Sequence, residues 1–380
     1  MANLVKIKEK EIYIVNKINE FKNPMHIYIP ILKKETFKLN DYIYKNTNFN
    51  SFVTSVSGYI SGIKKVRYKN KLVEALEITN DFKENKNFKR KKEKVKSKEE
   101  LINILNNYYL DDIANKISKL DSIENLVISS IDEEIYSVKE FLRLANNYID
   151  ILETSDNLLN ILNVKTGIIA TKSTNFKSIK NVKSIIGTYP NLKISLVPDK
   201  YLISYKEFLC KYLNLKQENI LVLTTSEIYN IFKCLKKAKD NTEQLITISG
   251  DAILKSLVIN VRLYTSLEEI LDEYIKIEED DYEIYVNGYL KGRKIKDYKE
   301  IIITKDINSI VINKKDSEEV TSCINCGACN KICPYNINVK KCYTNNSNNK
   351  RCIGCGLCNY ICPANIKLKE IVMSDKNEKL

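Results

Sequence analysis

A repeated run of cysteines near the end of the chain constrains it more than any other feature. Two segments of the form C-x2-C-x2-C-x3-C-P recur at an offset of 29 residues, one from Cys323 to Pro334 and the other from Cys352 to Pro363. Three thiolates on one tight turn can reach three irons of a four-iron cube, and the fourth, one helical turn further on, points toward a second cube. The pattern therefore predicts two [4Fe–4S] clusters that exchange their fourth ligands.

The same spacing is the ligand run of bacterial two-cluster ferredoxins. Structural zinc sites use pairs of cysteines separated by about a dozen or more residues, and the single histidine, His26, excludes sites that need several imidazoles. Because each cluster has four cysteine ligands, we expect an electron relay rather than a catalytic centre. The first predicted cluster is held by Cys323, Cys326, Cys329 and Cys362, and the second by Cys352, Cys355, Cys358 and Cys333.

Cysteine usage also indicates the compartment. Nine of the eleven cysteines follow residue 320, the first residues (MANLVKIKEKEIY) contain no apolar signal core, and no run approaches the ~18 apolar residues that a membrane span needs. We therefore expect a cytoplasmic protein with no integral membrane span, associated at most peripherally with the cytoplasmic face of the cell membrane. Cys342 is expected to be a free thiol, and Cys210 and Cys234 to pack as small hydrophobic residues.

The net charge of +13 comes from lysine spread along the whole chain, which indicates solvated faces rather than a nucleic-acid footprint. One local cluster exists, Phe82–Lys98, and its lack of an apolar period predicts an exposed linker. Within it, Lys89–Lys92 is the candidate contact for an acidic redox protein or an anionic lipid surface. We expect no nucleic-acid binding, because the run has no interleaved aromatic residues beyond Phe82 and Phe88.

Between residues 125 and 250, short apolar runs alternate with helical patterns. The helical patterns cover Val138–Leu152 and Ile228–Leu235, and we expect their apolar residues in the core. Alternation of this kind predicts a parallel sheet covered by helices. The expected strands are Leu126–Ile131, Gly167–Thr171, Leu192–Val197, Ile220–Thr224 and Leu245–Ser249.

Segments rich in β-branched residues flank this region. Before it, Val53–Ile63 alternates around two glycines and predicts a compact β module with tight turns. His26 falls just before the expected strand Ile27–Ile29, and we expect a structural role for it. After the α/β region, Tyr282–Val286 and Ile301–Ile312 are expected to be strands.

The order of these parts resembles the C subunit of the Rnf-type (Rsx) electron-transport complex, which is itself related to the NADH-binding subunit of respiratory complex I. Residues 26–30 with 39–46 are similar to the family's opening segment, and Val53–Ile63 looks like its biotinyl-like hairpin. Residues 247–252 with 260–265 resemble its soluble-ligand-binding β-grasp, and Val286–Arg293 resembles its "GGPMMGR" segment. The two-cluster tail follows where the family places it.

The resemblance also implies FMN and NADH, which the family holds with a "GxGGAxFPTxxK" loop ahead of the first strand of its α/β domain. The corresponding stretch, Asn103–Ile117, contains neither glycine nor proline, so its backbone cannot approach a phosphate closely without strain. The family's "NGxECEPY" becomes Ser129–Tyr136, in which Asp132–Glu134 place negative charge where a phosphate would lie; we expect this trio to form a solvated acidic turn. Its "YPxGxE" corresponds at best to Tyr201–Glu207. We therefore expect flavin and nucleotide binding to be lost, or replaced by residues outside these motifs, and assign no residue to either.

The expected fold class is multidomain α/β, with a barrel-sandwich-like β module, a parallel-sheet α/β domain, a β-grasp domain and a two-cluster ferredoxin module. The expected division is residues 1–81 for the biotinyl-like β module, 82–100 for a basic linker, 101–243 for the α/β domain with degenerate flavin and nucleotide motifs, 244–315 for the soluble-ligand-binding β-grasp-like domain, and 316–380 for the ferredoxin-type domain with two [4Fe–4S] clusters.

Three functions remain open on the sequence. The leading hypothesis is a protein similar to Rnf C that passes single electrons through its two clusters to or from a redox partner, either a ferredoxin or other subunits of a membrane electron-transport complex. The second is an FMN-dependent NADH:ferredoxin-type oxidoreductase subunit, and the third is a soluble electron adaptor of a catabolic reductase. We assign no catalytic residue and expect no NADH oxidation by the chain alone.

Overall fold

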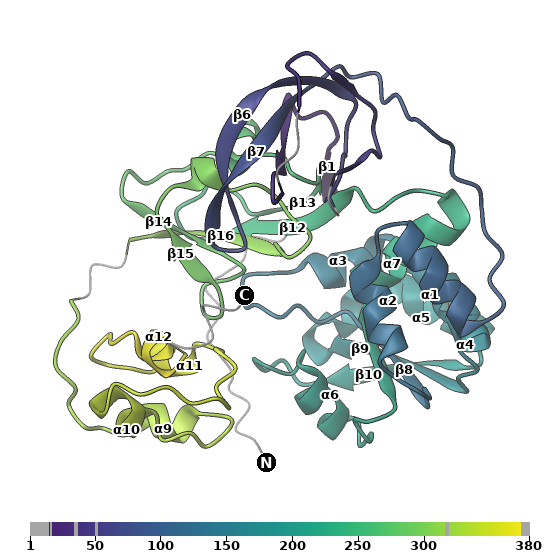
Figure 1. Ribbon diagram of the computed structural model, residues 1–380. Coiled ribbons are helices and arrows are strands. Elements are labelled where there is room, and N and C mark those ends of the chain that lie inside the picture. Colours follow the sequence, from purple (N-terminus) through teal and green to yellow (C-terminus); the bar gives the residue numbers. More distant parts are fainter. Residues whose placement is uncertain (1–14, 16, 34–36, 50–51, 316–318, 374–380) are drawn as a thin grey trace.

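The computed structural model describes residues 15, 17–33, 37–49, 52–315 and 319–373. Within these residues the architecture is mixed α/β, with three main sheets and a small helical unit that carries the cysteine repeat (Figure 1). The sheets of the described part stay open, and none closes into a barrel.

The first sheet is antiparallel, in the order β2-β7-β6-β3. Its two long strands form a hairpin across Lys69 and Asn70, which both take a positive φ. Gly58 is required at the start of β6, because a Cβ there would lie 1.9 Å from the carbonyl oxygen of Thr79. The strands are β2 (His26–Pro30), β3 (Tyr42–Ile43), β6 (Gly58–Tyr68) and β7 (Lys71–Asn80), with a small pair β4 (Asn48–Phe49) and β5 (Phe52–Val53) beside them.

The second sheet is parallel, in the order β10-β9-β8-β11. Successive side chains of a strand point to opposite faces, and those of this sheet are apolar on both, so the sheet has a core on each face. Leu126 and Ile128 of β8 pack with the helices of one face, and Val127 packs on the other. The strands are β8 (Asn125–Ser129), β9 (Thr166–Lys172), β10 (Leu192–Val197) and β11 (Ile220–Thr224), so the expected bounds of the last two are confirmed. The helices are α1 (Lys98–Asn107), α2 (Asp111–Ser118), α3 (Lys139–Asn146), α4 (Tyr148–Ile161), α5 (Lys180–Ile185), α6 (Lys206–Tyr212) and α7 (Thr225–Lys237), with 3-10 turns η1 (Ser173–Ile179) and η2 (Ile186–Thr188).

The third sheet is mixed, in the order β1-β13-β12-β16-β14-β15. Its first strand comes from the N-terminal segment and pairs in parallel with β13, so that Ile18 lies opposite Val258. The elements are β1 (Ile18–Phe21), β12 (Glu243–Ser249), β13 (Leu257–Arg262), α8 (Leu267–Tyr274), β14 (Tyr282–Val286), β15 (Arg293–Ile295), η3 (Tyr298–Glu300) and β16 (Ser309–Lys314).

Three local expectations are corrected by this arrangement. The strand expected at Leu245–Ser249 exists, but it belongs to the third sheet rather than to the parallel one. The strand expected over Ile301–Ile312 begins only at Ser309, because a turn closed by Thr304 and Asp306 interrupts it. The helical stripe of Val138–Leu152 is divided at Asn147, and Ile149 is 53% exposed rather than in the core.

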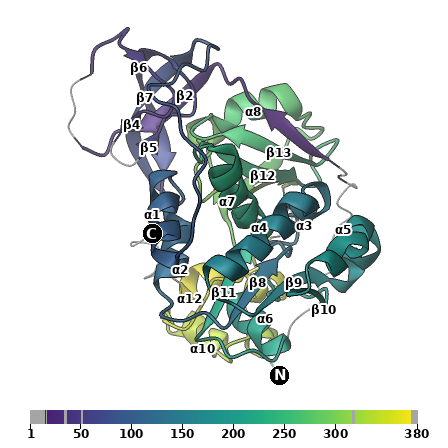
Figure 2. The same ribbon diagram turned by 90° about the vertical axis from the view of Figure 1, so that its right-hand side faces the viewer.

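The basic run forms a strap without helix or strand segments that leads from the first sheet to α1 (Figures 1 and 2). Most of its side chains are exposed, as expected for a linker. Arg90 is different: its guanidinium Nε lies 2.9 Å from Asp240, and it stacks over the rings of Phe88 and Tyr108. This residue of the candidate contact Lys89–Lys92 is therefore already engaged within the chain.

The cysteine repeat folds into four short helices: α9 (Ala328–Ile332), α10 (Val339–Thr344), α11 (Leu357–Tyr360) and α12 (Leu368–Val372). Between them lies a small apolar cluster that contains Ile337, Val339, Ile366 and Leu368. None of the helices in the described part of the chain combines the length and apolar character that crossing a bilayer demands.

Candidate metal centre

The cysteine repeat is matched by a repeat of backbone conformation. Asn325 and Gly327 of the first run have φ values of 59° and 70°, and Gly354 and Gly356 of the second have 66° and 77°. These left-handed residues bend the chain between successive cysteines, and a short helix begins after each second one. Asparagine adopts this conformation more readily than other residues with a Cβ, so Asn325 can stand where the second run has glycine.

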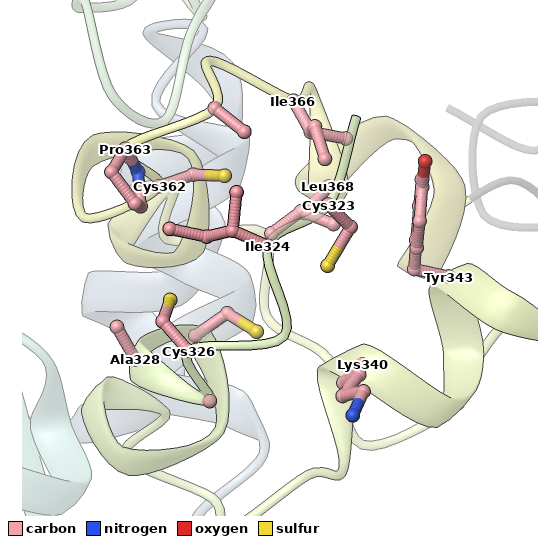
Figure 3. A pocket seen from close by; sticks show the side chains of 13 residues that line it. Cys323, Ile324, Cys326, Ala328, Lys340, Tyr343, Cys362, Pro363, Ile366 and Leu368 are labelled. Atoms are coloured by element: carbon pink, nitrogen blue, oxygen red, sulfur yellow. The ribbon is translucent and has the colours of Figure 1, made fainter. Parts of the chain in front are cut away.

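The first of two hollows is lined by Cys323, Cys326 and Cys329 of the first run and by Cys362 of the second. It encloses about 410 Å³, open solvent included. Figure 3 shows the sulfur atoms of Cys323 and Cys362 directed toward the space between them. The remaining lining is largely apolar and includes Ile324, Ile366 and Leu368.

The second hollow has the converse composition. It is lined by Cys352, Cys355 and Cys358 of the second run and by Cys333 of the first, and it encloses about 380 Å³, open solvent included. Each hollow thus takes three cysteines from one run and one from the other, which is the grouping that the spacing predicts. Cys342 is buried in the apolar cluster nearby but lines neither hollow.

The donor set fits four-iron clusters. In the described residues, no group of three or more His, Cys, Asp or Glu side chains is gathered closely enough to hold a single metal ion. A four-iron cluster makes a different demand, because each cysteine binds its own iron at a separate corner. Four thiols around one hollow with apolar walls meet that demand. The cysteine-rich C-terminal region therefore fits an iron–sulfur protein.

Burial affects the protonation of the thiols in the second hollow. Burial raises the pKa of Cys355 to about 11 and that of Cys358 to about 12, so the bare thiols stay protonated at neutral pH. Binding of metal must release these protons. Two backbone amides already face sulfur: the N–H of Ile337 donates to Cys333 Sγ and that of Gly354 to Cys352 Sγ, each at 3.4 Å.

Two asparagines, whose role was not predicted from the sequence, support the two hollows. Asn330 follows Cys329, and its side chain accepts a hydrogen bond from the amide of Lys340 at 2.9 Å. Asn359 follows Cys358 and accepts from the amide of Lys369 at 2.7 Å. Each bond joins a cysteine helix to the next helix of the unit. The repeat of asparagine after the third cysteine of each run was the available signal.

The second hollow packs against the rest of the chain. Leu357 and Ile353 lie in one apolar cluster with Tyr201, Phe208 and Leu290, which come from the region of the second sheet and from the β14–β15 connection. The hydroxyl of Tyr201 donates to the carbonyl oxygen of Cys355 at 2.8 Å. Tyr335 adds a hydrogen bond to Glu207. The cysteine unit is thus attached through the side of its second hollow.

The stretch that aligns with the flavin loop is filled by its own side chains. Tyr108 and Leu110 are 2% and 3% exposed. The Tyr108 hydroxyl donates to the carbonyl oxygen of Lys91 at 2.7 Å, and Arg90 lies 4.7 Å from the centre of its ring. Tyr109 takes a positive φ of 61°, and its carbonyl accepts from the Lys305 ammonium at 2.6 Å. These residues do not fit a flavin at this position.

The usual ligand position of an open α/β sheet is also occupied by the chain's own residues. In open α/β sheets ligands bind where the strand order reverses, here at the C-terminal ends of β8 and β11. Helix α7 starts there, and the amide of Ser226 and the hydroxyl of Thr225 both donate to the carboxylate of Glu140 at 2.8 Å. Burial alone would raise the pKa of Glu140, but Lys139 and these hydrogen bonds hold it below its usual value. The anion at this helix N-terminus is the chain's own carboxylate.

The acidic trio differs from the expected solvated turn. Glu133 is exposed and pairs with Lys291 at 2.5 Å, but Glu134 is only 7% exposed. Burial raises the pKa of Glu134 to about 7, and a Cβ on Gly288 would lie 2.2 Å from its carboxyl carbon. Asp132 turns inward and accepts from the Ser137 hydroxyl at 2.7 Å; its burial raises its pKa to about 6. The turn is packed because the β14–β15 connection covers it.

Two curated proteins of one name are similar to part of this chain. No family model matches the chain. The C subunit of the ion-translocating oxidoreductase complex from Buchnera aphidicola subsp. Acyrthosiphon pisum (strain APS) is 25% identical over 239 residues, which cover 60% of this chain and 50% of that protein. The protein of the same name from Buchnera aphidicola subsp. Baizongia pistaciae (strain Bp) is 22% identical over 235 residues, covering 58% and 46%.

Among solved structures, a chain of an NAD+-reducing [NiFe]-hydrogenase in the air-oxidized state has a TM-score of 0.48 and 9% identity, covering 74% of this chain and 54% of that chain. The chain spans about half the length of the curated relatives it matches. Over about 60% of its length, the chain is a divergent relative of the C subunits of ion-translocating oxidoreductase complexes.

Proposed function

We propose that this chain is an electron-transfer subunit similar to Rnf C, which passes single electrons through two [4Fe–4S] clusters to or from a redox partner protein. The observation that carries the proposal is the distribution of eight cysteines over two hollows, three from one run and one from the other in each. Cys323, Cys326, Cys329 and Cys362 would hold the first cluster, and Cys352, Cys355, Cys358 and Cys333 the second.

The chemistry of a bound cluster is the uptake and release of one electron. The chain's own contribution is to hold eight thiolates in fixed positions, to keep the hollows apolar, and to offer amide hydrogens to the sulfurs of Cys333 and Cys352. Hydrogen bonds and exclusion of water set the reduction potential of such a centre. All four ligands of each cluster are protein thiolates, so the site is suited to relay rather than to substrate binding.

The remaining units are proposed as scaffold and docking surface. The three sheets support a division into a biotinyl-like β module within residues 1–81, an α/β domain over 101–243 and a β-grasp-like domain over 244–315, with the basic strap 82–100 between the first two. Strand β1 is shared across this division, because it completes the sheet of the third unit. The cysteine unit, 316–380, attaches to the second and third units through its second hollow.

The partner is proposed to be a ferredoxin or another subunit of a membrane electron-transport complex, since the relatives are named as subunits of such a complex. A peripheral position on the cytoplasmic face of the membrane is the location that fits this role. The chain itself is not proposed to oxidise NADH, because its own side chains fill the stretch that aligns with the flavin loop, and its own carboxylate, that of Glu140, occupies the N-terminus of α7.

The test is iron and acid-labile sulfide analysis of anaerobically purified protein, with electron paramagnetic resonance after dithionite reduction. We expect about eight irons per chain, since two [4Fe–4S] clusters have four each. Cys355→Ala should remove the second cluster and leave the first largely assembled. Cys342→Ala is the matched control: it removes a buried thiol that lines neither hollow and should keep the full iron content. Tightly bound zinc without a reducible iron signal would refute the proposal.

A further inference from the structure

The two cysteine runs are repeats of each other, but their surroundings differ. We propose that the face of the first run, made by Ile324, Cys326, Gly327 and Lys340 and called here the run-one face, is the docking site for a small acidic iron–sulfur protein of the ferredoxin type. This inference rests on the proposed electron-transfer function and names where the partner binds and by what chemistry.

The second run shows how such a face is covered. A Cβ on Gly356 would lie 2.2 Å from the carbonyl oxygen of Leu290, so the β14–β15 connection touches the backbone of the run directly. Lys369 donates from its ammonium to the carbonyl oxygens of Leu290 at 3.0 Å and Gly292 at 2.8 Å. Ile353 packs in the apolar cluster around Leu290. The covering segment is therefore a tight loop that offers a row of carbonyl oxygens to one lysine.

At an offset of 29 residues, the first run has the equivalent residues, and no described part of the chain covers them as the β14–β15 connection covers the second run. Ile324 is the equivalent of Ile353 and is 66% exposed, and Gly327 has no atom within 4 Å of the position of a Cβ. Cys326 is exposed. Lys340 is the equivalent of Lys369, and within the described residues its ammonium has no hydrogen bond or ion pair. Figure 3 shows its nitrogen at the rim, directed away from the Cys323 sulfur.

The exposure of these first-run residues differs from ordinary surface exposure, because their equivalents in the second run are contact residues. The apolar and cationic groups that secure the second run to the chain's own loop are duplicated on the first run, next to the hollow that would hold the outer cluster. Ile324 and Gly327 leave the edge of this hollow open to a protein that approaches closely. The run-one face therefore has the form of a second docking surface of the same kind.

Charge selects the occupant. Residues 319–373 contain only two acidic side chains, Glu319 and Glu370. The basic side chains of the same segment are Lys331, Lys340, Lys341, Lys350, Arg351, Lys367 and Lys369. A positive surface around an apolar centre steers and orients a negatively charged partner. A ferredoxin-type protein meets this requirement when its docking loop offers carboxylates or carbonyl oxygens to Lys340, as the loop at Leu290 does to Lys369.

The experiment measures equilibrium binding of an acidic two-cluster ferredoxin to the intact holoprotein, with both proteins oxidised so that no electron transfer contributes. At low ionic strength the wild type should bind, and its Kd should rise with added salt. The double variant Ile324→Asp, Lys340→Glu should raise the Kd by about tenfold or more, since it removes an apolar anchor and reverses a charge at the centre of the face. Lys65→Glu is the matched control for charge: Lys65 is exposed on β6 of the first sheet, outside the cysteine unit, and its reversal should change the Kd less than about twofold.

Iron content and dithionite reduction of every variant are measured in parallel. Full iron content with an unchanged Kd for the double variant would overturn the docking site and leave the electron-transfer function standing. An equal effect of Lys65→Glu, or no binding of the ferredoxin to the wild type at low salt, would overturn it as well. Loss of clusters in the wild type would instead refute the proposed function.

Discussion

Replacing Gly356 by alanine should weaken the attachment of the cysteine unit far more than the same replacement at Gly327. Both glycines have a left-handed φ, 77° and 70°, so an alanine costs about 1 kcal/mol of backbone strain at either position. Only at Gly356 would the new methyl group meet a backbone atom, the Leu290 carbonyl oxygen, at 2.2 Å. Forcing that contact apart adds about 2 kcal/mol, a usual cost of overpacking.

The assay is amide hydrogen exchange of the segment 287–293 in anaerobic holoprotein, read by mass spectrometry. A local destabilisation of about 2 kcal/mol predicts exchange roughly 30-fold faster in Gly356→Ala than in the wild type. Gly327→Ala should leave exchange in this segment within about twofold, because its strain lies at the other end of the unit. Equal exchange in the two variants would refute the reasoning that the second run is secured through the loop at Leu290.

Three further outcomes follow from the structure. The pKa of Glu134 is raised from 4.5 to about 7 in the folded protein, so its ionisation destabilises the fold as the pH rises from about 4.5 through 7. Glu134→Gln should therefore be more stable than the wild type by about 3 kcal/mol at pH 8, and the difference should shrink toward pH 5. A difference in urea midpoints that does not depend on pH would contradict this. Arg90→Ala leaves the buried Asp240 carboxylate without its cationic partner and should lower the free energy of unfolding in urea by about 2 kcal/mol. Lys91→Ala on the exposed strap should change it by less than about 0.5 kcal/mol, and equal losses would argue against the Arg90 anchor. NADH with added FMN should not bleach the cluster absorbance of the purified chain while dithionite does, and rapid bleaching by NADH would restore the flavoenzyme hypothesis.

The sequence predicts local features well where a short apolar run is bounded by turn residues. Leu192–Val197 and Ile220–Thr224 are strands with the expected bounds, since both are short apolar runs, and a helical pattern follows the second. Prediction from the sequence fails where a turn interrupts an apolar run. The β-branched residues at 301–303 and 310–312 are typical of one continuous strand, but the turn between them is made by polar residues that give only a weak signal.

For the candidate site, spacing alone groups the cysteines, because the C-x2-C-x2-C-x3-C-P run has a fixed geometry that does not depend on distant residues. The spacing of the cysteines does not predict where the cysteine unit attaches to the rest of the chain. Whether Gly356 or Gly327 meets a neighbour depends on a loop at Leu290 that is remote in sequence, and the burial of Glu134 depends on Gly288. Long-range packing of this kind leaves no periodic pattern in the chain.

The position of β1 has a consequence for how the protein is made. Asn19 donates from its side chain to the carbonyl of Val258, a contact that spans 239 residues. At about 10 residues per second of synthesis, the first strand waits on the order of 24 seconds before its neighbour β13 exists. During that time the first hairpin and the parallel sheet can fold on the growing chain, while β1 stays without its neighbouring strand. Completion of the third sheet is therefore a late event, which joins the N-terminal strand to units that are already formed.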